Sequence, residues 1–215
     1  MKIFEHPEIK SLYDELYDKL LEESGRGAIL IATAKAEDFL TDLIKVILPH
    51  ELSRDDKRKI VKDTFHSKIT YAYAFRLISK SLKDSLNALR DVRNDAAHSS
   101  SKFELHELNE KMGTVYDLGP NIRTMIVNMS TELLVGSKII SLNGIFEEQN
   151  YTEQEKKDEL IKIFNDPEKK KIIDKQLPHW ELITGMCIIC GIILHSKDKF
   201  NGLDMQSKTW DNLLK

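Results

Sequence analysis

Apolar residues recur at every third or fourth position along most of the chain, the spacing that collects them on one face of an α-helix. Over residues 26–48, for example, Ile29, Ala36 and Leu43 belong to one continuous apolar stripe. The chain lacks the one-by-one alternation that is typical of half-buried strands,. The sequence predicts an all-α protein with helices over 8–23, 26–48, 54–63, 67–79, 81–98, 104–112, 120–142, 152–164, 166–175 and 179–196.

Short hydroxyl residues mark several predicted helix starts. Ser53, Ser81 and Thr152 each stand at one, and the last two precede an acidic residue at the spacing of a capping box,. A side-chain oxygen at that position accepts a hydrogen bond from a backbone N–H that the helix cannot satisfy itself. These residues therefore indicate where the chain turns into a helix.

The length of the chain sets the expected domain organisation. Its 215 residues, 41% of them apolar, can bury a sizeable core in one domain,. The stretch 143–151 is the best candidate for a linker. We predict a helical domain over 1–142 and, over 143–215, either a helical C-terminal extension packed on it or a small subdomain.

Charge argues against a general binder of duplex nucleic acid. The formal net charge is −3, whereas such proteins usually carry a basic footprint. Lysines and arginines cluster at 57–62 and at 169–171, and charge runs of this kind usually lie on solvated helix faces. We expect no binding to duplex DNA.

The two cysteines predict burial rather than metal chemistry. Cys187 and Cys190 lie in an apolar helical run without a second ligand pair, so neither a zinc site nor a cofactor is expected. That run, Leu182–Leu194, has 13 residues, and a bilayer span needs about 20. The charged N-terminus lacks the apolar segment of a signal peptide. We predict a core helix, no membrane association and a reducing cytoplasmic setting.

The candidate catalytic residues lie at the C-terminal end of the helix that is predicted to start at Ser81. Leu82, Leu86 and Leu89 trace its apolar stripe, and Arg93 is expected in the middle of that stripe, where a charge is costly unless it is paired or functional,. His98 is expected at its water-exposed edge, one turn above Asn94. A guanidinium and an imidazole there could bind and cleave a phosphodiester. The short motif alone favours a structural arginine and a helix-capping histidine.

Three blocks of sequence add to this pattern. They are Gly25-Arg26-Gly27-Ala28-Ile29-Leu30-Ile31-Ala32 with Glu37-Asp38-Phe39-Leu40, the run from Phe65 to Ile78, and the motif from Arg93 to His98. Their order and spacing over about residues 20–100 resemble the MltR (mannitol operon repressor-like) family of the HEPN superfamily. The chain departs from the family pattern at Gly25 and at Asp95-Ala96.

The resemblance implies a HEPN-like antiparallel helical bundle and two alternative functions. In HEPN ribonucleases the matching residues, here Arg93, Asn94 and His98, cleave RNA without a metal ion, in some cases in toxin or phage-defence systems. MltR-type members are known mainly as regulators, which implies a non-catalytic protein-interaction module without direct DNA binding. Paired HEPN domains imply a homodimer in which two motifs face one cleft.

Two further residues are expected to support the site. Glu37 flanks the apolar stripe of its helix and is the predicted counter-charge of Arg93,. Arg26 is a candidate to line the same groove. The aromatic set of Tyr71, Tyr73 and Phe75 could stack nucleic-acid bases, but such spacings favour a role in the core or an interface.

Overall fold

The computed structural model describes residues 3–49, 51–98, 103–148 and 151–201, and all regular secondary structure in these residues is helical, as predicted. Two 3-10 helices, η1 (Ile3–Glu5) and η2 (Leu105–Leu108), accompany the α-helices. These are α1 (Pro7–Leu20), α2 (Gly25–Ile47), α3 (Arg54–Val61), α4 (Phe65–Ala74), α5 (Lys80–His98), α6 (Asn109–Val115), α7 (Ile122–Glu148), α8 (Glu153–Asn165) and α9 (Pro167–Asn201).

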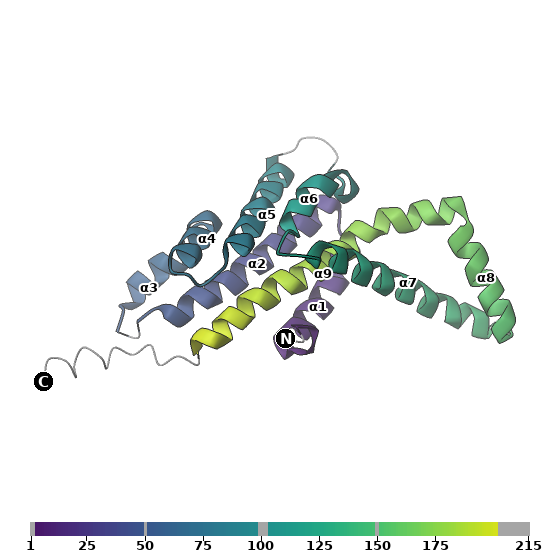
Figure 1. Ribbon diagram of the computed structural model, residues 1–215, viewed down its shortest axis with the longest axis horizontal. Helices are drawn as coiled ribbons and strands as arrows, with labels where there is room; N and C mark the ends of the chain where they lie inside the picture. Colours follow the sequence, from purple (N-terminus) through teal and green to yellow (C-terminus); the bar gives the residue numbers. More distant parts are fainter. Residues whose placement is uncertain (1–2, 50, 99–102, 149–150, 202–215) are drawn as a thin grey trace, which may run out of the picture.

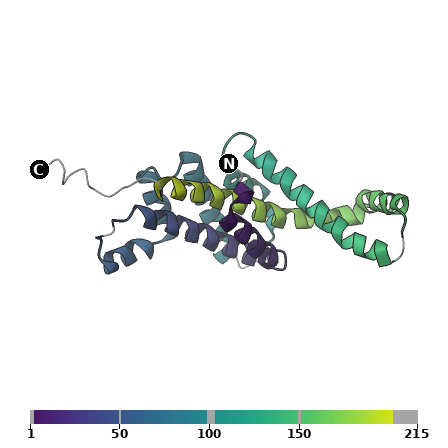
Figure 2. The ribbon, with the colours of Figure 1, turned by 90° about the horizontal axis from the view of Figure 1, so that it is seen from below.

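The C-terminal half of α9 runs through the centre of a helical bundle, between α1 and α2 (Figures 1 and 2). Its predicted core run, Leu182–Leu194, is buried apart from the half-buried Ile192, which confirms that prediction. The same core holds apolar residues of α1, α2, α4, α5 and α6. The domain boundary predicted at residue 142 falls inside α7, and α9 shares one core with the N-terminal helices.

A long arm extends from the bundle and consists of α7, α8 and the N-terminal half of α9 (Figure 1). By length and composition alone, two helices of the described residues could cross a membrane, Ile122–Leu142 of α7 and α9. The most apolar stretch of α9 is 72% buried, so the core explains its composition. The corresponding stretch of α7 is only 17% buried, and the bundle does not explain its apolar character.

Two predictions about the C-terminal helices are wrong. The segments 166–175 and 179–196 form one continuous helix, α9, although Pro178 lies inside it. Proline removes one backbone donor, but α9 packs against other helices directly beyond this point: Trp180 contacts Tyr17 of α1, and Thr184 accepts a hydrogen bond from Ser130 of α7. The predicted linker 143–151 is largely helical, because α7 continues to Glu148; residues 149–150 lie outside the described residues.

The helix starts follow the local capping chemistry, with one correction. Ser53 and Thr152 cap α3 and α8 as predicted, and Thr152 does so within a complete capping box. At the start of α5, however, Ser79 Oγ accepts the hydrogen bond from the backbone N–H of Leu82 at 3.2 Å, so Ser79 rather than Ser81 is the cap. The helix predicted over 67–79 is α4, which ends sooner because Arg76 is left-handed at φ 59°.

Candidate functional site

The last two turns of α5 carry the predicted motif on the surface of the protein. Arg93 and His98 are exposed and Asn94 is half-buried. Arg93 Nη1 donates a hydrogen bond to Asn94 Oδ1 at 3.2 Å. The prediction that Arg93 lies inside the apolar stripe of the helix is therefore wrong, and the guanidinium faces solvent together with the imidazole.

The arrangement of α4 and α5 explains why Arg93 is exposed. The two helices lie side by side as an antiparallel pair (Figure 1). His66, the second residue of α4, contacts Arg90 of α5. Arg93 lies almost one turn beyond that contact, where α4 has not yet begun to cover the stripe.

Arg90 and His66 lie next to the motif, and the sequence analysis did not predict either of them as a site residue. Arg90 Nη1 donates to Asn87 Oδ1 at 3.1 Å and to His66 Nδ1. Because a guanidinium only donates, His66 Nδ1 is the acceptor of this hydrogen bond. Arg90, Asn94 and His98 follow each other at intervals of four residues, which places them in one row on the helix. That spacing is the sequence signal that could have identified Arg90.

Glu37 does not pair with Arg93, so this prediction is wrong. Its Oε1 accepts a hydrogen bond from Lys68 Nζ of α4 at 2.6 Å. Glu37 lies twelve residues into α2, about 18 Å along the axis from Gly25. The start of α2, not its middle, lies at the level of the motif.

Arg26 does lie at the same end of the bundle as the motif. A Cβ on its neighbour Gly25 would come within 2.9 Å of the backbone of Phe103 and Leu105. These two residues follow the end of α5 closely in sequence, so the close approach brings the first turn of α2 to that end. The first turn of α2, which contains Arg26, thus lies at that end of the bundle, and the role of Arg26 in the groove stays a prediction.

The acidic side chains beside the motif are engaged by cations. Asp95 Oδ2 lies 2.5 Å from Lys111 Nζ of α6, and Asp91 Oδ1 accepts from Arg90 Nη2 at 2.7 Å. Within the described residues no carboxylate forms an ion pair with Arg93. The exposed guanidinium, amide and imidazole are thus suited to an anionic ligand such as a phosphate group.

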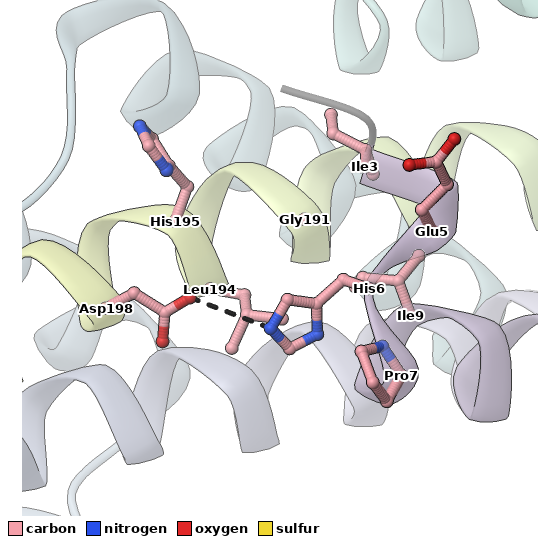
Figure 3. Close-up of a pocket in the computed structure, with 9 residues that line it drawn as sticks. All are labelled: Ile3, Glu5, His6, Pro7, Ile9, Gly191, Leu194, His195 and Asp198. Atoms are coloured by element: carbon pink, nitrogen blue, oxygen red, sulfur yellow. Dashed lines mark ion pairs between the residues drawn. The ribbon is translucent and has the colours of Figure 1, made fainter.

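A separate hollow of about 450 Å³ lies where η1 and the start of α1 meet α9 (Figure 3). His6 points across it towards Asp198, with 3.7 Å between His6 Nε2 and Asp198 Oδ2, while the ring of His195 points away. His6 also caps α1, because its Nδ1 accepts from the backbone N–H of Glu8 at 3.2 Å. We assign this hollow a structural role in joining the N-terminus to α9.

The remaining candidates for chemistry are either buried or spread apart. Cys187 and Cys190 are buried free thiols, and burial raises the pKa of Cys187 to about 12, so neither is a nucleophile near neutral pH. In the described ranges, no three His, Cys, Asp or Glu side chains are grouped so that they could hold a metal ion.

For the aromatic set, the core part of the prediction is wrong, and a role in an interface stays a prediction. Tyr71 and Tyr73 are 37% and 39% exposed, and Phe75 is 63% exposed, so the three rings are not part of the core. They lie on α4 and at its C-terminal cap, whereas His66, which contacts the motif helix, is at the other end of α4. Tyr71 and Phe75 line another hollow, which is considered below.

The chain matches no protein-family model, and no curated protein and no solved structure matches it significantly. The resemblance to the MltR family and the HEPN-like arrangement of the bundle therefore stay predictions. A function has to be inferred from the residues of the site itself.

Proposed function

We propose that this protein is a metal-independent endoribonuclease with a HEPN-like bundle, and that Arg93, Asn94 and His98 form its active site. One observation carries the proposal: Arg93 and His98 are both exposed on the last two turns of α5. Next to them, Arg90, whose charge is balanced by Asp91, holds the imidazole of His66. The guanidinium of Arg93 can donate hydrogen bonds to a phosphodiester of single-stranded RNA, and the imidazole of His98 can transfer a proton there.

The proposed reaction uses only groups of the protein, the RNA and water. The ribose 2′-hydroxyl attacks the adjacent phosphorus, and the bond from phosphorus to the 5′-oxygen of the next nucleotide breaks. The 2′-hydroxyl loses its proton and the leaving 5′-oxygen gains one; His98 carries out one of these transfers as general base or general acid, and water carries out the other. Arg93 stabilises the negative charge that builds up on the phosphoryl oxygens, and Asn94 holds the guanidinium. The products are a 2′,3′-cyclic phosphate and a 5′-hydroxyl.

We also propose that the active form is a cytoplasmic homodimer. The exposed end of α5 leaves both catalytic side chains accessible to a second copy. Two motifs facing one cleft would surround the phosphate with two guanidinium groups and exclude water from it, which strengthens their electrostatic effect.

A second function, a non-catalytic regulatory module, is favoured by a different observation. The apolar stretch of α7 is only 17% buried, and an apolar surface of that kind is typical of protein interfaces. In this alternative the arm binds a protein partner, and the exposed residues of α5 have no catalytic role.

The two functions are separated by incubating the purified protein with single-stranded RNA in the presence of EDTA. We expect cleavage by the wild type and a loss of about 100-fold or more in Arg93→Ala and His98→Ala. Asp84→Asn is the matched control, because Asp84 is an exposed residue of α5 that pairs with Lys80, away from the motif. Undiminished cleavage by both alanine variants would exclude this site, and absence of wild-type cleavage would favour the regulatory module.

A further inference from the structure

A hollow of about 650 Å³ opens at the end of the bundle opposite to the motif. It lies among the C-terminal end of α2, the helices α3 and α4, and the C-terminal end of α9 (Figure 1). Its wall is mainly apolar, and the residues that matter here are Ile47, Ile60, Tyr71, Phe75, Leu77 and Phe200. Its volume is within the range of about 300–1,000 Å³ that is typical of occupied binding pockets.

The rim of the hollow presents aromatic surface to water. Phe75 is 63% exposed and Tyr71 is 37% exposed. The hydroxyl of Tyr71 donates to Asp63 Oδ2 at 2.9 Å, so the polar end of this side chain is already satisfied. What remains uncovered is ring surface, which is stabilised when an apolar group covers it.

The chain continues directly beyond one wall of this hollow. Phe200 lines the hollow, α9 ends one residue later, and residues 202–215 follow. This segment carries Leu203, Trp210, Leu213 and Leu214. Three of these four apolar residues, Trp210, Leu213 and Leu214, lie within a stretch of five residues.

We propose that residues 202–215 dock in this hollow of their own chain, with Trp210, Leu213 and Leu214 covering Phe75 and Tyr71. Trp210 follows Phe200 by ten residues, and nine or ten extended residues span roughly 30 Å, ample to turn back onto a wall that Phe200 forms. A tether of this length also keeps the segment at an effective concentration of about a millimolar or more, which favours it over a free partner.

The fluorescence of Trp210 tests the docking in the full-length protein. The only other tryptophan, Trp180, is 4% exposed in the core, and Trp180→Phe leaves Trp210 as a single reporter. We expect a blue-shifted emission and at least about threefold weaker quenching by acrylamide than in the urea-unfolded chain. Adding Phe75→Asp should shift the emission to the red and restore quenching, whereas Ile140→Asp, at a 74% exposed position of α7, should change neither.

Two results would overturn the proposal. The first is acrylamide quenching of Trp210 that is as strong in the native protein as in urea, both in Trp180→Phe and after Phe75→Asp is added. The other is protection of Trp210 that disappears on dilution, because it would place the segment in the hollow of a second copy. Circular dichroism checks that Trp180→Phe is folded, and the difference in emission between wild type and Trp210→Phe gives the same readout without altering Trp180.

Discussion

At the residue scale, one ion pair holds a charge inside the bundle. Lys68 is 5% exposed, yet it carries an ammonium group on the inner side of α4. Its Nζ lies 2.6 Å from Glu37 Oε1 of α2. A buried ammonium without a counter-charge is strongly destabilising, so this pair fixes α4 against α2 and thereby positions His66 beside α5.

We predict that Glu37→Gln lowers the free energy of unfolding by about 1–2 kcal/mol. The value is below the roughly 3–5 kcal/mol of a fully buried pair because solvent reaches the partly exposed Glu37. Urea unfolding measures the change. Asp42→Asn is the matched control, since Asp42 pairs with Lys45 on the same helix and both are about half exposed. A loss in Glu37→Gln no larger than in this control would contradict the assigned role.

At the element scale, α9 depends on glycine where another element crosses it closely. A Cβ on Gly185 would lie 2.4 Å from Cε1 of the buried Tyr116. Tyr116 ends α6, which packs against α5. Because Gly185 has no side chain, Tyr116 at the end of α6 can pack directly on α9.

Gly185→Ala should destabilise the protein by about 1–3 kcal/mol, because a methyl group there overpacks the core. Gly136→Ala is the opposite case. Gly136 lies inside α7 with nothing within 4 Å of an added Cβ, so alanine should stabilise by about 0.5–1 kcal/mol through helix propensity. Thermal unfolding of both variants measures the two changes in stability. Equal melting temperatures for Gly185→Ala and Gly136→Ala would refute the packing assigned to Gly185.

Helix type and most helix starts were predictable because their causes are local. The caps at Ser53 and Thr152 need only nearby residues. The exposure of Arg93 was not predictable, because it depends on where a different helix, α4, begins to cover α5. The continuity of α9 through Pro178 likewise depends on packing against helices that are far away in sequence.

At the scale of the whole molecule, α9 joins the bundle to the arm. It has 35 residues, about 50 Å of helix. At the junction, His179 Nε2 donates to the carbonyl oxygen of Glu23 at 3.3 Å, in the turn between α1 and α2. This contact ties the point where the arm leaves the bundle to the end that carries the motif.

We predict that acid loosens this junction. Burial lowers the pKa of His179 below its usual 6.5, so the unfolded chain takes up a proton first as the pH falls. The stabilising contribution is fully present above about pH 6.5 and is lost as the pH drops through the lower pKa of the folded protein. The melting temperature should fall between pH 7 and 5 by more in the wild type than in His179→Gln.

His106→Gln is the control for this pH dependence, because His106 lies exposed on η2. It should keep the wild-type dependence of the melting temperature on pH. Identical pH dependence in the wild type and His179→Gln would show that another group is responsible.

The most direct test of the central claim is the chemistry at a single ribose. An RNA oligonucleotide that the wild type cleaves in EDTA is compared with the same oligonucleotide carrying a 2′-deoxy nucleotide at the cleaved position. We predict a 2′,3′-cyclic phosphate from the first and no cleavage at that position in the second, and no cleavage of either by His98→Ala. Cleavage of the 2′-deoxy position, or equal rates for the wild type and His98→Ala, would contradict the account.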